Sequence, residues 1–394
     1  MRNRTKMKLK VSDVFLILLI SLTIGGISIS HALADTLSSA AIGWTQLTNT
    51  KIRPVCPNPA LYPNIQGVEG CSAVTADWSS GVFDTARNRL IVWGGGHNGY
   101  LGNEIYALNL NESPITMTRL NNPSTQPPTA LAANSSTGDG QASSRHTYDH
   151  IVYMSHVDRM FVFGGASPPY GFMLDDTWTF NFASMTWQKM SPSGTKPEAN
   201  YGRATVYSPA AKKVYIHDQF SLYSYSVEND AYTTLSNEAP VGQEMTGVLD
   251  SKRQTFISVG NGAVTAFDLS SGSNFKMQTW ATTGGASILN YTNPGVAYDP
   301  ISDRIVAWAG GNTVYTLDPA ASNKVWVAVT YPGGPGAALG NGTFKRFAYS
   351  PASNAFVVVN SVDSDAFALK LTPGAGTGTG MLPGLSAPKN LKVQ

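Results

Sequence analysis

The sequence is poor in charged residues, in cysteine and in long apolar runs. Only 13% of its 394 residues are charged and the formal net charge is +2, which argues against the strongly basic surface of a nucleic-acid-binding protein. Its two cysteines form no CxxC pair, and no HxH or HExxH motif is present, so the short ligand spacings of common metal sites are missing. The 38 glycines and 23 prolines instead indicate a turn-rich protein rather than a helical one.

The N-terminus has the pattern of a secretory signal peptide. Five basic residues precede the apolar run 14–29, and Ala32-Leu33-Ala34 supplies the small residues of a cleavage site. We predict cleavage after Ala34, which removes residues 1–34 and leaves a formal net charge of −2 on a secreted or periplasmic protein. The alternative is an uncleaved membrane anchor, but the run is shorter than the roughly 20 residues that span a bilayer.

Cys56 and Cys71 lie in the proline-rich segment 51–76, which we expect to cross one face of the protein. Export would allow them to form a disulfide, and closing this loop would stabilise the fold by about 3 kcal/mol in the chain-entropy model. Free or metal-bound thiols are the alternative.

From residue 82 a module of up to four short strands recurs along the chain. Its first strand ends before a tight turn at six positions: Asp84, Met154, Ser208, Asp250, Asp299 and Ser350. The period is near 50 residues, and the polar insert 121–144 lengthens the first interval. The sixth unit lacks a fourth strand, and we expect the strand predicted at 44–47 to supply it.

Glycine clusters follow the second strand of several units, and an aromatic residue lies in the third. The glycines are Gly94-Gly95-Gly96, Gly164-Gly165 and Gly310-Gly311, and the aromatic residues are Tyr106, Trp178 and Tyr315. In these features, over about residues 41–371, the chain resembles the kelch and galactose-oxidase-like propellers. The resemblance implies an all-β kelch-type β-propeller of six four-stranded blades, with seven possible, closed by its N-terminal strand.

We assign residues 35–371 to the propeller and 372–384, rich in Gly and Pro, to a linker. The closing residues 385–394 are similar to the first strand of a fibronectin type III domain. We expect a monomer.

In a propeller, the loops between blades and the loops after the second strands share one face. We expect His97, His146, Tyr201 and Arg203 there as catalytic candidates, because they offer a base, an acid and a cation for proton abstraction beside a sugar carboxylate. The binding candidates on this face are Asn98, Tyr100, Arg145, His150, His217, Glu244, Tyr291 and Arg346.

Structural roles are the alternative for several of these residues. His97 could cap its loop, one of His146 and His150 could be packed, and Arg203 and Arg346 could pair with acids of neighbouring blades. A metal site built from His97, His146 and His217 is a weaker alternative.

Two functions fit this pattern. The first is a carbohydrate-binding or protein-interaction module with an extracellular polysaccharide or protein ligand, and without nucleic-acid or membrane partners. The second is a polysaccharide lyase like the propeller lyases that cleave uronate-containing glycans, with His146 or His97 as base, Tyr201 as acid, and Arg203 and Arg346 as neutralisers. Copper-radical chemistry is disfavoured. The galactose oxidase family uses a cysteine cross-linked to a tyrosine beside the copper, and here Cys56 and Cys71 look paired with each other, which leaves no cysteine for that role. We expect no cofactor, although calcium could stabilise the ring.

Overall fold

The computed structural model describes residues 35–128, 135–168, 171–237 and 244–376. The predicted signal peptide (1–34) and the predicted fibronectin-like segment (385–394) lie outside the described residues, as does most of the predicted linker.

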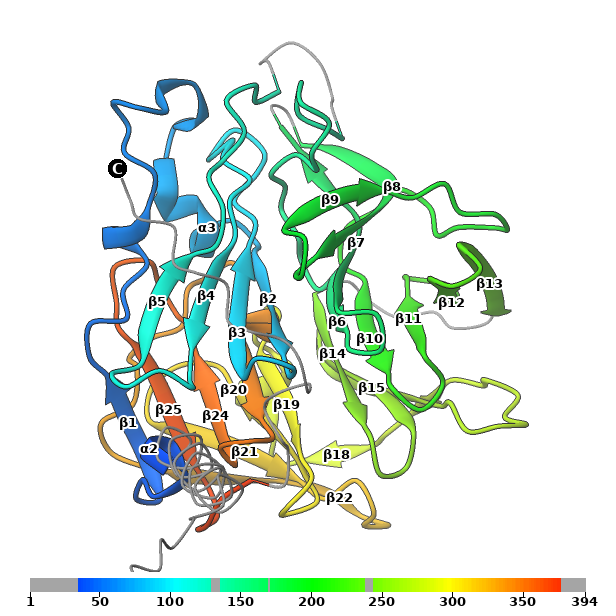
Figure 1. The fold of residues 1–394 in the computed structure, drawn as a ribbon. Helices are drawn as coiled ribbons and strands as arrows, with labels where there is room; N and C mark the ends of the chain where they lie inside the picture. The colour runs from blue at the N-terminus through cyan, green and yellow to red at the C-terminus, as the bar shows by residue number, and fades with distance from the viewer. Residues whose placement is uncertain (1–34, 129–134, 169–170, 238–243, 377–394) are drawn as a thin grey trace, which may run out of the picture.

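Six antiparallel sheets lie in a ring around a central axis (Figure 1), and the innermost strand of each contacts the innermost strands of its two neighbours. Blades 1 to 3 contain β2 (Ser80–Asp84), β3 (Arg89–Trp93), β4 (Tyr106–Asn109), β5 (Thr116–Arg119), β6 (Ile151–Met154), β7 (Arg159–Ser167), β8 (Phe172–Asn181), β9 (Thr186–Lys189), β10 (Ala204–Ser208), β11 (Lys213–His217), β12 (Leu222–Ser226) and β13 (Ala231–Ser236). Blades 4 to 6 contain β14 (Met245–Asp250), β15 (Thr255–Gly260), β16 (Ala263–Asp268), β17 (Gln278–Thr279), β19 (Gly295–Asp299), β20 (Arg304–Trp308), β21 (Thr313–Leu317), β22 (Lys324–Thr330), β23 (Phe347–Ser350), β24 (Ala355–Val358), β25 (Ala366–Lys370) and β1 (Gly43–Leu47). The fold is therefore the predicted propeller, with six blades rather than seven.

The ring closes as the sequence predicts. β1 is the outermost strand of blade 6 and pairs antiparallel with β25, with Gly43 opposite Lys370 and Leu47 opposite Ala366. The Trp44 Nε1 also donates to the carbonyl of Asn312 in blade 5. The two ends of the propeller thus meet in one sheet, and β1 covers an edge that would otherwise be exposed.

The strands differ in length from blade to blade. β7 and β8 extend beyond the other second and third strands and form a long hairpin. The fourth strand of blade 4 is only two residues long. β18 (Thr282–Thr283) adds a parallel strand beside β22.

Two positions with positive φ recur in all six blades. Four residues after each innermost strand, the turn contains Asn88, Asp158, Lys212, Gln254, Asp303 or Asn354. Six residues before the end of each innermost strand, the chain enters the blade through Trp78, Tyr148, Gly202, Glu244, Asn293 or Phe344. The left-handed backbone of bulky residues such as Trp78 therefore belongs to the repeat and is not by itself a mark of function.

An ion pair crosses the central channel. Lys345, which precedes β23 in blade 6, places its Nζ 2.7 Å from Oδ1 of Asp149, which precedes β6 in blade 2. Oδ2 of Asp149 accepts the backbone N–H groups of Thr205 and Gly247 in blades 3 and 4. The pair divides the channel into two ends and links four blades.

Short helical segments lie mostly in loops. They are α2 (Asp35–Ser38), η1 (Arg53–Val55), η2 (Pro63–Ile65), η3 (Gly70–Ser72), α3 (Ala73–Ala76), α4 (Ala286–Leu289) and η4 (Phe344–Arg346). Cys56 and Cys71 form a disulfide with Cα atoms 6.2 Å apart, as predicted. The segment closed by this disulfide packs on the β3–β4 loop, where the backbone N–H groups of Val68 and Glu69 donate to the carbonyls of Asn98 and Gly99.

Candidate functional site

The loop between β3 and β4 places His97 on the face that holds the connections between blades. Its glycines let it approach neighbouring loops closely: a Cβ on Gly96 would lie 2.0 Å from the Cα of Arg145, and a Cβ on Gly99 would lie 2.0 Å from Oδ2 of Asp77. Side chains at these positions would push the loops apart. The glycine cluster therefore brings His97, Asp77 and the segment that starts at Arg145 together.

A row of aromatic rings results. The ring of His146 stacks on His97 with centroids 4.9 Å apart, and it lies 5.1 Å from the ring of Trp78 in a tilted arrangement. The ring of Tyr148 lies edge-on to that of His146 with centroids 6.0 Å apart. The ring of Tyr201 follows, with its centroid 6.2 Å from that of Tyr148. We call these five residues the aromatic row. It joins the entry loops of blades 1, 2 and 3, and it brings together three of the four predicted catalytic residues.

Exposure changes along the row. His146 is buried, whereas Trp78, His97 and Tyr148 are half-buried and Tyr201 is 43% exposed. Beside Tyr201, Gln219 donates to the Tyr201 carbonyl and is followed by Phe220, which is 63% exposed. Ring surface is thus available to a ligand along the Tyr201 end of this face.

The ionisable neighbours of the row are carboxylates. Oδ2 of Asp77 lies 3.8 Å from Nε2 of His146. Burial, followed by the nearby charge of Asp77, raises the pKa of Glu69. Burial, followed by His146, lowers the pKa of His97 and so favours its neutral form. A neutral His97 is able to accept a proton. The acidic groups Asp77 and Glu69 lie at the His146 end of the row, whereas the charges of Arg203 and Lys345 act on His150 at the Tyr148 end.

The three candidate arginines are all fully buried. Arg145 contacts Asp176 at 2.8 Å and donates to several backbone carbonyls, and Arg346 donates to four backbone carbonyls. Arg203 donates to the Asn200 carbonyl and lies over the ring of Phe163. None of the three guanidinium groups is accessible to a ligand on the surface.

The remaining histidines add no exposed ring to the row, although the buried ring of His150 lies 5.4 Å from that of Tyr148. His150 is buried, accepts the N–H of Arg203 through Nε2, and has a pKa that burial lowers well below its ordinary value. His217 packs edge-on against Phe267 inside the blades. His156 lies in the β6–β7 turn on the opposite face.

Four binding candidates occupy other positions on the same face. Asn98 is exposed beside His97, whereas Tyr100 is buried and donates to Glu104. Glu244 and Tyr291 line a separate cavity of about 310 Å³ between blades 4 and 5. The aromatic row and this cavity are therefore two distinct parts of the face.

The sequence did not single out Trp78 or Tyr148 as site residues. Both occupy the recurring left-handed position before an innermost strand. Aligning the six strand ends would have placed both beside His146 and Tyr201, because residues at equivalent positions enter the same face. Among the described residues, no three His, Cys, Asp or Glu side chains are grouped to hold a metal ion. None of the helices in the residues that the structure describes is long and apolar enough to cross a membrane.

Comparison with known proteins agrees with this architecture. The family described as the KLHDC2/KLHL20/DRC7 Kelch-repeats domain matches residues 65–246, which span blades 1 to 3. The solved structure titled "Structure of YjhT" is 13% identical, with a TM-score of 0.50 over 73% of this chain and 92% of that one. The chain is a six-bladed β-propeller, and its residues 65–246 are similar to this kelch-repeat family. No curated protein sequence matches it significantly.

Proposed function

We propose that this chain is a secreted carbohydrate-binding propeller that holds a neutral glycan against the aromatic row. The observation that carries the proposal is the continuous series of rings from half-buried Trp78 to exposed Tyr201. Sugar rings present apolar C–H faces that pack on aromatic rings, while their hydroxyl groups bond to polar groups at the rim. Asn98 supplies such a group beside the row.

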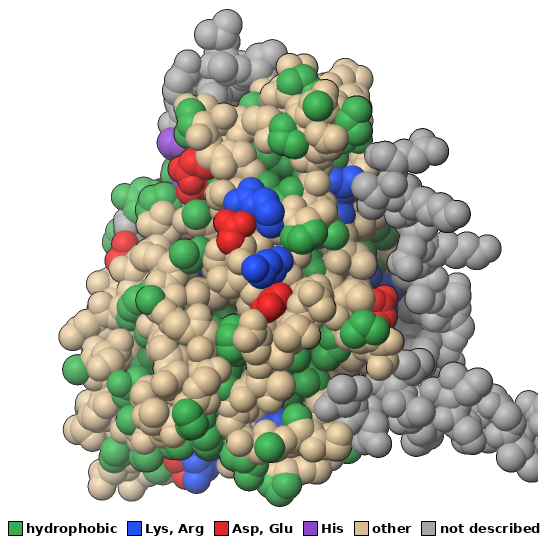
Figure 2. Space-filling view, turned by 90° about the vertical axis from the view of Figure 1, so that its left-hand side faces the viewer, with side chains coloured by type: hydrophobic (Ala, Val, Ile, Leu, Met, Phe, Trp, Pro, Cys, Tyr) green, Lys and Arg blue, Asp and Glu red, His purple; other side chains and the backbone are tan. Residues whose placement is uncertain are grey.

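Charge favours a neutral glycan over an acidic one. Glu69 and Asp77 lie beside His146, and they would repel a uronate carboxylate. On the side that carries β1 and β5, the charged side chains are sparse and both signs lie next to one another (Figure 2). That mixed surface offers no broad positive patch for a polyanion.

The glycan proposal is tested with a glycan array followed by titration of the best ligand. Trp78→Ala and Tyr201→Ala should each weaken binding about tenfold or more, because each removes a stacking surface. Trp280→Ala is the matched control, since Trp280 is half-buried at the outer edge between β17 and β18. Equal affinity in all three variants would reject the aromatic row as the site.

A polysaccharide lyase is the second candidate. The stacked pair of His97 and His146 favours it, with His97 held in its proton-accepting form. The burial of Arg203 and Arg346 argues against it, because neither can neutralise a substrate carboxylate. The test is the absorbance of unsaturated uronates during incubation with acidic polysaccharides: a rise abolished by His146→Ala would replace the binding proposal with the lyase.

A further inference from the structure

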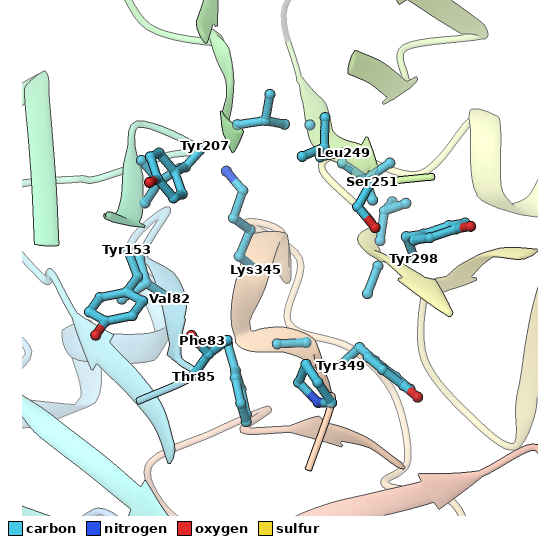
Figure 3. A pocket seen from close by; sticks show the side chains of 18 of the residues that line it. Val82, Phe83, Thr85, Tyr153, Tyr207, Leu249, Ser251, Tyr298, Lys345 and Tyr349 are labelled. Carbon is cyan, nitrogen blue, oxygen red and sulfur yellow. The ribbon is translucent and has the colours of Figure 1, made fainter. Parts of the chain in front are cut away.

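The channel also opens on the face opposite the aromatic row. There a cavity of about 320 Å³ is surrounded by the innermost strands of all six blades, and Lys345 is among its lining residues (Figure 3). Its size lies at the lower end of the range for small-molecule sites. The ion pair of Lys345 with Asp149 separates it from the aromatic row.

Aromatic rings line its mouth in five of the six blades. The residues at this position are Phe83, Tyr153, Tyr207, Leu249, Tyr298 and Tyr349. Each tyrosine hydroxyl is bonded to a turn residue: Asp158, His156, Asp303 and Asn354 bond to Tyr153, Tyr207, Tyr298 and Tyr349, respectively. Figure 3 shows these hydroxyls pointing away from Lys345. The hydroxyl bonds hold the rings in place, and the rings form part of the apolar lining of the cavity.

One polar group serves the deep end of this apolar cavity. The Lys345 ammonium approaches Oδ1 and the carbonyl oxygen of Asp149, and its third N–H has no partner within the described residues. The other oxygen of the Asp149 carboxylate accepts the N–H groups of Thr205 and Gly247. Burial lowers the pKa of Lys345, and a second anion would stabilise the charged form.

We propose that this cavity is a second ligand site, which binds a small monocarboxylate with a flat apolar body. The apolar body would lie between the aromatic rings, and the carboxylate would accept the remaining N–H of Lys345. A charge-assisted hydrogen bond in such an apolar site fixes the orientation of the ligand and selects the acid over its neutral analogue. This site and its ligand class are independent of the glycan proposal.

The test compares 2-naphthoate with 2-naphthalenemethanol by isothermal titration to the full chain. We expect the acid to bind about tenfold more tightly or better, because only the acid forms the charged hydrogen bond. Equal affinity of the two compounds, or no binding of the acid below millimolar concentration, would overturn the proposal. This comparison depends on no variant.

Variants then locate the site. Leu249→Trp places an indole at the mouth and should abolish naphthoate binding, whereas Val327→Trp, on an exposed position of β22, should leave it unchanged. Lys345→Met should remove the preference for the acid if that variant folds. Leu249→Trp should preserve glycan binding and Trp78→Ala should preserve naphthoate binding, so failure at one site is distinguishable from failure at the other. Unchanged naphthoate affinity in Leu249→Trp would contradict the assignment.

Discussion

At the scale of single residues, Gly96 determines how closely two loops approach. A Cβ there would lie 2.0 Å from the Cα of Arg145, which is backbone and cannot move aside as a side chain could. We expect Gly96→Ala to lower the free energy of unfolding by about 2 kcal/mol or more. Gly340→Ala is the control, because nothing lies within 4 Å of a Cβ there. Urea denaturation of both variants measures the difference, and equal stabilities would show that the loops are not in close contact.

Asp149 makes stability depend on pH. Burial outweighs the favourable effect of Lys345 and raises the pKa of Asp149 to about 6, whereas an unfolded aspartate has a pKa of about 3.9. The folded state therefore binds more protons between these values, and this residue's contribution to stability falls as pH rises from about 4 to about 6.

Asp149→Asn should lack this pH dependence. On acidification from pH 6 to 4, the wild type should gain stability relative to the variant, on the order of 2 kcal/mol. Urea unfolding of both proteins across this pH range provides the measurement. A relative loss of stability in the wild type would mean that Lys345 and the backbone N–H groups outweigh burial.

At the scale of elements, two pairs of neighbouring blades are joined by the same arrangement of one arginine and two aspartates, which we call a clamp. Arg87, in the β2–β3 turn, makes two hydrogen bonds of 2.7 and 2.6 Å to Asp158 in the next blade and also contacts Asp84. Arg253 repeats the arrangement with Asp303 and Asp250. Each clamp therefore joins the turn of one blade to the turn of the next.

Removing a clamp should destabilise the ring. Arg87→Met should cost about 1–3 kcal/mol, because the two-point contact is largely buried and Asp158 would lose its partner. Arg304→Met should change stability by less than about 0.5 kcal/mol, since its pair with Asp318 is well exposed. Thermal unfolding distinguishes the two variants, and an equal effect would assign no special role to the clamp.

At the scale of the whole molecule, closure by β1 should keep the edge of β25 from pairing with other chains. Deleting residues 35–47 would leave β25 as an exposed edge, and we expect association and loss of a cooperative unfolding transition. Deleting residues 35–41 keeps β1 and should leave the protein monomeric. Size-exclusion chromatography compares the two, and a monomeric, equally stable protein without β1 would contradict this role.

The repeat made the architecture predictable, but local contacts decided the site. Six strand ends and a fourth strand at 44–47 sufficed to predict the closed ring, because blade geometry depends on a period that survives sequence change. The sequence was enough to predict that His97, His146 and Tyr201 lie on one face of the propeller. It could not show that Arg203 and Arg346 are buried, because burial depends on which loops cover them. The pairing of Lys345 with Asp149 joins residues 196 positions apart, and no sequence spacing indicates it.

The most direct test of the proposed function is titration of the wild type with two oligosaccharides of equal length and linkage, one neutral and one composed of uronates. The aromatic row beside Glu69 and Asp77 predicts tighter binding of the neutral sugar, and Trp78→Ala should remove that binding. Preferential binding or cleavage of the uronate would contradict the account, because it would require a cation that the buried arginines do not provide.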